Sequence, residues 1–250
     1  MSARLFDDLT DVYEAIIDWP KRLANEGPFY RRWFQRIGAK SVLDAACGTG
    51  RHAAMFHSWG LRVEGADLSQ RMIERAVAAF GTPTGLRWVT RAFEEPVAAV
   101  EPFDAAVCVG NSLALAPDMT TVERAIRELF AAVRPGGLVV VQVLNLWRMA
   151  DGPCVWQKAK RAALAQGDVQ VLKGVHRCGT RGYVDLVLAD PAAGGLLHSE
   201  SLPFLGLQSH DLDRLARQAG AAQVQFFADH REHPYDPATS VDLLMVATAG

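Results

Sequence analysis

The chain contains 250 residues, of which 50% are hydrophobic, and its formal net charge at pH 7 is −2. This length suits one domain with an insertion, or at most two small domains, and the apolar fraction is sufficient for a sizeable core. The charge argues against a nucleic-acid-binding protein, because the densest basic segments, Arg31-Arg32 and residues 158–161, fit solvated helix faces.

Targeting and membrane signals are weak. No apolar run approaches the ~20 residues of a membrane span. Acids at Asp7 and Asp8 stand where a signal peptide needs an apolar core. The four cysteines lie far apart and include no C-x-x-C pair, which fits a reducing compartment. We therefore expect a cytoplasmic protein with no membrane or nucleic-acid partner.

The first 145 residues alternate between helix-like and strand-like patterns. Residues 5–37 are amphipathic and are predicted to be helical, with breaks at Trp19-Pro20 and Gly27-Pro28. Ser69 and Thr120 are predicted to cap two later helices. The predicted strands are 41–45, 62–66, 86–90, 105–109 and 138–144, with helices at 51–59, after Ser69, and from Thr120 to Val133. This alternation predicts a parallel sheet covered on both faces.

The pattern changes after residue 145. Strand-like segments at 169–175, 182–189 and 196–203 follow one another with turn-rich connections, which predicts an antiparallel meander. A helix at 210–219 and strands at 223–227 and 243–248 complete the chain. We predict an α/β fold in which residues 1–40 form an N-terminal helical segment. Residues 41–250 then form the main domain, with 146–206 as an insertion.

The segment from Val42 to His52 says most about function. An apolar run ends near Asp44, a small-residue turn with Gly48 and Gly50 follows, and a helix-like run begins. Glycines allow the backbone to approach a ligand closely, and a helix start offers unpaired N–H groups. Asp67 ends the next predicted strand, where an acid is well placed to bind ribose hydroxyls. These features predict a nucleoside-containing cofactor, although the turn alone also fits the fingerprint of an NAD-type oxidoreductase.

Three segments together carry a family resemblance. Leu43–Gly50, Phe103–Leu113 and Arg134–Val141 resemble, in order and spacing, the class I S-adenosylmethionine-dependent methyltransferases. The resemblance implies a Rossmann-like seven-stranded sheet, S-adenosylmethionine as the cofactor, a small-molecule substrate, and a small antiparallel insertion after the fifth strand, on the substrate side. It also implies that residues 1–40 form an N-terminal helical lid over the cofactor, for which a helix pair packed on the sheet is the alternative. The cofactor-binding residues that it implies are Tyr13, Asp44, Ala46, Cys47, Gly48, Gly50, Asp67, Leu68, Met72, Ala92, Phe93, Val109, Gly110 and Asn111.

The resemblance also gives these residues separate roles. The loop from Ala46 to Gly50 passes under the methionine part and ribose, and Asp44 supports it and faces the amino group. Asp67 takes the ribose hydroxyls, whereas Leu68, Met72 and Phe93 contact adenine. No dedicated catalytic side chain is predicted, because positioning alone supplies ~7–11 kcal/mol of barrier reduction in such displacements. No metal is expected, since His230 and His233 lack a third ligand.

The Gly110-Asn111-Ser112 loop is similar to that of the glycine and sarcosine N-methyltransferases, which implies an amine acceptor, with a hydroxyl acceptor left open. Those enzymes place a carboxylate-binding arginine where this chain has Leu144, so an acceptor larger and less charged than glycine is expected. A non-catalytic cofactor-binding protein is a further alternative. The predicted apolar walls of the acceptor pocket are Leu113, Leu115, Leu144, Leu146 and Trp147, with Trp156, His176 and Tyr183 as further candidates.

Overall fold

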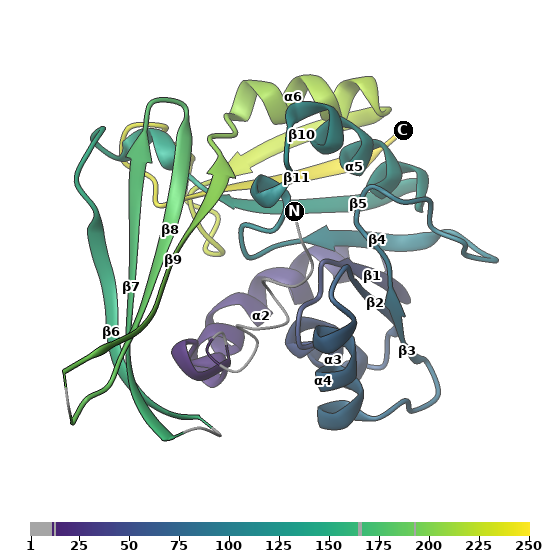
Figure 1. The fold of residues 1–250 in the computed structure, drawn as a ribbon. Coiled ribbons are helices and arrows are strands. Elements are labelled where there is room, and N and C mark those ends of the chain that lie inside the picture. The colour runs from purple at the N-terminus through teal and green to yellow at the C-terminus, as the bar shows by residue number, and fades with distance from the viewer. Residues whose placement is uncertain (1–11, 13, 165–166, 193) are drawn as a thin grey trace.

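The computed structural model describes residue 12 and residues 14–164, 167–192 and 194–250. A seven-stranded sheet in the order β10-β11-β5-β4-β1-β2-β3 forms its centre (Figure 1). Only β11 runs antiparallel to its neighbours in this sheet. The predicted α/β fold is therefore confirmed. The strands are β1 (Ser41–Ala45), β2 (Arg62–Asp67), β3 (Leu86–Thr90), β4 (Phe103–Cys108), β5 (Val133–Leu144), β10 (Ala221–Phe227) and β11 (Asp242–Ala249).

Helices cover both faces of this sheet. Figure 1 shows α2, α3 and α4 on one face and α5 and α6 on the other. Strand β5 is apolar on both faces. Val139 and Val141 belong to the buried cluster on one face of the sheet, and Leu138 and Val140 belong to the cluster on the other, so helices must cover both. The helices are α2 (Trp19–Arg36), α3 (Arg51–Ser58), α4 (Gln70–Phe80), α5 (Met119–Ala131) and α6 (Ser209–Gln218), with short 3-10 turns at Leu113–Leu115 and Leu146–Arg148.

The insertion forms a separate antiparallel sheet in the order β6-β7-β8-β9. It stands beside the edge at which β4 and β5 end (Figure 1), which is the ligand side of an open α/β sheet. Its strands are β6 (Val155–Leu164), β7 (Gly167–Cys178), β8 (Arg181–Ala189) and β9 (Leu196–Leu205). The sequence predicted three strands in this meander, whereas the structure has four. Residues 158–161, which were expected on a solvated helix face, lie in the additional strand β6.

Two helix boundaries differ from the prediction. Helix α2 runs through Gly27-Pro28 without a break, because Phe29, Tyr30 and Phe34 are buried and their packing outweighs the backbone bond that Pro28 cannot make. Trp19-Pro20 is the start of this helix. Helix α5 is capped by Asp118 rather than by Thr120, since the Asp118 carboxylate accepts a hydrogen bond of 2.8 Å from the Thr121 N–H. In the part of the chain that the structure describes, no helix has the length and apolarity to cross a membrane.

Candidate active site

A cavity of about 300 Å³, which we call the glycine-loop cavity, opens where β1, β2 and β4 end. Part of its wall consists of residues that the sequence pattern selected. These are Ala46, Gly48, Asp67, Leu68, Met72, Ala92, Phe93 and Gly110. The remaining wall residues are Arg91, Glu94, Glu95, Ser112, Leu115, Ala116, Pro117 and Thr121. The cavity therefore joins four segments that lie far apart in the sequence.

The glycine loop holds its shape through its backbone and through Asp67. Gly48 and Gly50 have φ angles of 55° and 81°, in the left-handed region that favours glycine. A Cβ at Gly50 would lie 2.5 Å from the Trp88 ring, so the position also lacks room for a side chain. The Asp67 carboxylate accepts hydrogen bonds from the Gly48 N–H at 2.8 Å and from the Ser69 N–H at 2.9 Å. Asp67 thus ties the loop to the start of α4.

Asp44, in β1 just before this loop, is only 1% exposed and is not among the wall residues of the glycine-loop cavity. No hydrogen bond of standard geometry reaches either of its carboxylate oxygens from the described residues. Burial raises the pKa of Asp44 to about 6 and the negative charge of Asp67 adds to this shift, whereas His52, Arg22 and the nearby Ala53 N–H oppose it. A buried carboxylate without partners is costly, and a cationic group of a ligand would remove that cost.

Several predicted site residues lie outside the wall of the glycine-loop cavity. The pKa of Cys47 is raised well above its usual value by burial, and a Cβ at Gly65 would lie 3.1 Å from its sulfur, so Cys47 packs against β2. Val109 belongs to the buried core, and Gly50 is the N-cap of α3. Asn111 lines a neighbouring cavity. Tyr13 lies outside the described residues.

This neighbouring cavity, of about 360 Å³, lies between the central sheet, the second sheet and α2. We call it the second-sheet cavity. Gly110 and Leu115 line both cavities, so ligands in the two would approach each other at these residues. The other wall residues are Ile16, Ile17, Arg22, Glu26, Asn111, Gln142, Leu144, Gln157, Lys173, Val175, Val184, Leu186, Leu202 and Asp242.

The turn between the two cavities is fixed to β5. Gly110 and Asn111 both have positive φ angles, 76° and 71°. The Gly110 N–H donates to Gln142 Oε1 at 2.7 Å, and the Asn111 N–H donates to the Gln142 carbonyl at 3.2 Å. The Asn111 side-chain oxygen in turn accepts from the Leu144 N–H at 2.8 Å. These hydrogen bonds hold the turn at the junction where a transferred group would pass.

The predicted apolar wall of the acceptor pocket is only partly present. Leu115 and Leu144 line the second-sheet cavity, but Leu113 and Leu146 are fully buried in the core because their 3-10 turns face inward. Trp147 donates from its indole N–H to the Gly206 carbonyl at 3.0 Å. Charged groups enter the cavity from elements that the sequence analysis did not place there, namely Arg22, Glu26, Lys173 and Asp242.

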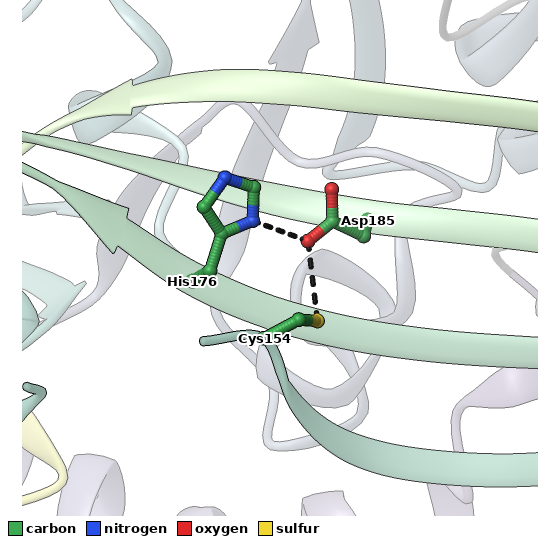
Figure 2. A group of neighbouring side chains, drawn as sticks. All are labelled: Cys154, His176 and Asp185. Atoms are coloured by element: carbon green, nitrogen blue, oxygen red, sulfur yellow. Dashed lines mark hydrogen bonds and ion pairs between the residues drawn. The ribbon is translucent and has the colours of Figure 1, made fainter. Parts of the chain in front are cut away.

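His176 and Tyr183 lie on the opposite face of the second sheet. Strand residues alternate in direction, so His176 points away from the cavity that Lys173 and Val175 line. Figure 2 shows His176 beside Asp185 and Cys154, with distances to Asp185 Oδ2 of 2.5 Å from His176 Nδ1 and 3.3 Å from Cys154 Sγ. These contacts, with one from Ser201, partner both Asp185 oxygens within the sheet. His176 and Tyr183 are therefore not acceptor-pocket walls.

Asp242, at the start of β11, is a carboxyl with a shifted pKa inside the second-sheet cavity. Burial raises its pKa to about 6. The hydrogen bond from Gln142 opposes this shift, as do the positive charges of Arg22 and Arg148, whereas the negative charge of Glu26 adds to it. A carboxyl with this pKa is mostly ionised at neutral pH and still able to accept a proton.

This shift predicts a pH-dependent stability. A pKa raised on folding stabilises the folded state only at low pH, and the contribution is lost as the pH rises through about 6. Replacing Asp242 with asparagine should therefore stabilise the ligand-free protein by about 2–3 kcal/mol more at pH 7.5 than at pH 4. Denaturant unfolding at both pH values measures the difference. An equal effect at the two pH values would contradict the shifted pKa. Asp44 has a similar pKa and also contributes to the pH dependence of stability. The free energy of unfolding of the variant is therefore compared with that of the wild-type protein at the same pH, so that the contribution of Asp44 cancels.

Comparison with known proteins agrees with this geometry. Residues 42–137 match a family model described as a methyltransferase domain. Over 243 residues the chain is 29% identical to a glycine/sarcosine N-methyltransferase from Parasynechococcus marenigrum (strain WH8102), and the alignment covers 92% of this chain and 80% of that one. These matches support a class I S-adenosylmethionine-dependent methyltransferase. The chain is also 32% identical over 133 residues to a glycine N-methyltransferase from Rattus norvegicus, an alignment that covers 46% of this chain and 45% of that one.

A solved structure shares the fold of the methyltransferase. The S-adenosylmethionine-bound CalS10, described as an amino pentose methyltransferase from Micromonospora echinaspora, superposes with a TM-score of 0.69 at 21% identity, covering 94% of this chain and 92% of that one. The methyltransferase-domain match, together with this fold neighbour that binds S-adenosylmethionine, supports S-adenosylmethionine as the cofactor. The family match thereby decides against the NAD-type alternative.

The residues around the glycine-loop cavity fit this cofactor. Its methionine part carries an ammonium group, which matches the unpartnered, buried carboxylate of Asp44. Its ribose hydroxyls match the carboxylate of Asp67, which lines the cavity. The apolar side chains of Leu68, Met72 and Phe93 lie in the same wall, where an adenine ring would need them. The role of each individual residue stays a prediction.

Proposed function

We propose that the methyltransferase transfers its methyl group to an amine nitrogen of a small molecule bound in the second-sheet cavity. The observation that carries this proposal is the position of Asp242. Its carboxylate lines a cavity that meets the glycine-loop cavity at Gly110 and Leu115. The names of the sequence relatives, glycine/sarcosine N-methyltransferase and glycine N-methyltransferase, support nitrogen as the acceptor atom.

The chemistry of the cavity favours an amine over a hydroxyl. S-adenosylmethionine supplies an electrophilic methyl group on a sulfonium, and only an acceptor with a free lone pair can displace the sulfur. An amine is protonated at neutral pH, and Asp242 can hold this ammonium and take its proton. A carboxylate with a pKa near 6 is far too weak a base to deprotonate an alcohol, so Asp242 gives a hydroxyl acceptor little help.

The fixed Gly110-Asn111 turn supplies alignment. Methyl transfer needs the acceptor atom, the methyl carbon and the sulfur in one line, and preorganised geometry can supply ~7–11 kcal/mol of the barrier. The side-chain oxygens of Gln142 and Asn111 accept hydrogen bonds from the Gly110 and Leu144 N–H groups, and these bonds fix the junction. The four cysteines are unpaired, which supports our expectation that the enzyme works in a reducing cytoplasm.

A paired assay tests the proposal. The purified protein is first titrated with S-adenosylhomocysteine by calorimetry and is then assayed with S-adenosylmethionine against matched panels of amines and alcohols. We expect binding of S-adenosylhomocysteine and formation of N-methylated products. Turnover of alcohols alone would overturn the choice of nitrogen. Binding without turnover on either panel would instead support a non-catalytic cofactor-binding protein.

A further inference from the structure

Between Val169 and Val175, one face of β7 carries a single charged residue, Lys173, whose cross-strand neighbour on β6 is Lys158. Along β7, residues Val169, Val171, Lys173 and Val175 share one face because side chains alternate along a strand. The three valines are 7%, 1% and 1% exposed, so this face is the buried one. Lys173 occupies it as well and lines the second-sheet cavity.

The ammonium group of Lys173 has no partner among the described residues. The ion pairs and hydrogen bonds of the described chain include none to its Nζ atom, and the charges that act on it, Lys158 and Arg22, are both positive. Burial and these two cations lower the pKa of Lys173. The Arg22 guanidinium already pairs with Glu26 at 2.8 Å, and Lys158 donates to the Ile16 carbonyl at 3.2 Å. Lys173 is half-buried, and a bound anion would offset the repulsion between its ammonium group and the neighbouring cations.

We propose that Lys173 binds an anionic group of the methyl acceptor, of which a carboxylate is the simplest. The enzyme then selects amines that also carry a negative charge. This proposal rests on the function proposed above. It replaces the expectation of an acceptor with little charge, because the cation missing at Leu144 is supplied from the second sheet, whereas Arg148 is not part of the wall.

Arg22 and Glu26 pair with each other, so the other two charged groups of the cavity, Lys173 and Asp242, define the shape of such an acceptor. Lys173 comes from the second sheet and Asp242 from the central sheet, and no ion pair joins them in the described structure. An acceptor with an amine at one end and an anion at the other satisfies both groups at once. Leu144, Val175, Val184 and Leu202 line the same cavity and favour an apolar body between the two ends.

The test uses pairs of acceptors that differ only in the anionic group. Amino acids are compared with the amines that remain when their carboxylate is removed, and a third arm carries a phosphonate in place of the carboxylate. For the wild-type enzyme we expect kcat/KM to be about tenfold to hundredfold higher for the anionic members, as a charge-assisted hydrogen bond implies. The phosphonate arm shows whether the site takes any anion or a carboxylate alone.

Three variants assign the effect to Lys173. Lys173→Met should lower kcat/KM for the anionic acceptors by about tenfold to hundredfold and should lower it far less for the matching neutral amines, and Lys173→Arg should restore most of the preference. Lys160→Met is the matched control, because Lys160 lies on the neighbouring strand β6 but does not line the second-sheet cavity. Its ammonium group donates a hydrogen bond of 2.8 Å to the Ala15 carbonyl. The thermal midpoint of the ligand-free Lys173→Met variant should rise, since the unpaired charge has gone, and this confirms folding independently of turnover.

The possible failures are distinguishable. If no amine is methylated although S-adenosylhomocysteine binds, the proposed function fails. In that case the same acceptors, titrated into the complex with S-adenosylhomocysteine, still test Lys173 through binding. If amines are methylated without preference for the anionic members, or if Lys173→Met keeps the preference, the assignment of Lys173 is wrong.

Discussion

Replacing Asp67 with alanine is expected to weaken the binding of S-adenosylhomocysteine by at least tenfold. The carboxylate lies in the glycine-loop cavity, where it is predicted to hold the two ribose hydroxyls, and each charge-assisted hydrogen bond contributes ~1.5–3 kcal/mol. The same carboxylate accepts from the Gly48 and Ser69 N–H groups, so the variant also loses the support of the loop. Isothermal titration calorimetry measures the change in affinity.

A matched control separates affinity from stability. Asp104 also accepts hydrogen bonds from two backbone N–H groups, those of Lys40 and Ser41, but at the opposite end of the sheet. Both Asp67→Ala and Asp104→Ala should lower the thermal midpoint of the ligand-free protein. Only Asp67→Ala should weaken ligand binding. Equal affinities in the two variants would remove Asp67 from the cofactor site.

The central sheet was predictable because its signals are local. Each strand is an apolar run bounded by turn residues, and the helices between them carry apolar residues at helical spacing. Strand β6 was missed because Lys158, Lys160 and Arg161 give it the composition of a solvated helix, and only pairing with β7 makes it a strand. Helix α2 was divided at Pro28 because its packing against the central domain leaves no mark in the local sequence.

The two cavities differ in how far the sequence predicts them. The glycine-loop cavity is built from short motifs at strand ends, so part of its wall could be selected from the sequence. The second-sheet cavity is assembled from α2, β5, β7 and β11, and no motif links Arg22 or Asp242 to the others. One signal was present, since Lys173 interrupts an alternation of valines. A charged residue at an apolar position of a strand is consistent with a position in a cavity wall as well as with a solvent-exposed sheet edge.

Replacing Asn111 with alanine is expected to lower kcat by about a hundredfold, because a displacement near 1 Å at the reacting centre has an effect of this size. The variant leaves the Leu144 N–H without its acceptor. It also places alanine at a φ of 71°, a left-handed conformation that alanine adopts less readily than asparagine does. The turn at the junction of the two cavities should therefore shift. Affinity for S-adenosylhomocysteine should change far less, since Asn111 lines the second-sheet cavity and not the glycine-loop cavity.

Two further variants separate the hydrogen bond from the backbone conformation at Asn111. Asn111→Gly keeps the freedom to adopt a positive φ but loses the acceptor for the Leu144 N–H, whereas Asn111→Asp keeps both. If the hydrogen bond positions the turn, kcat should fall in the order aspartate, glycine, alanine, with the aspartate variant nearest to wild type. Single-turnover kinetics on the preformed complex with S-adenosylmethionine measures the transfer step itself. An alanine variant with the wild-type transfer rate would show that the turn holds its position without Asn111. The alignment of acceptor and methyl group would then depend on the Gln142 contacts to Gly110 and Asn111 alone.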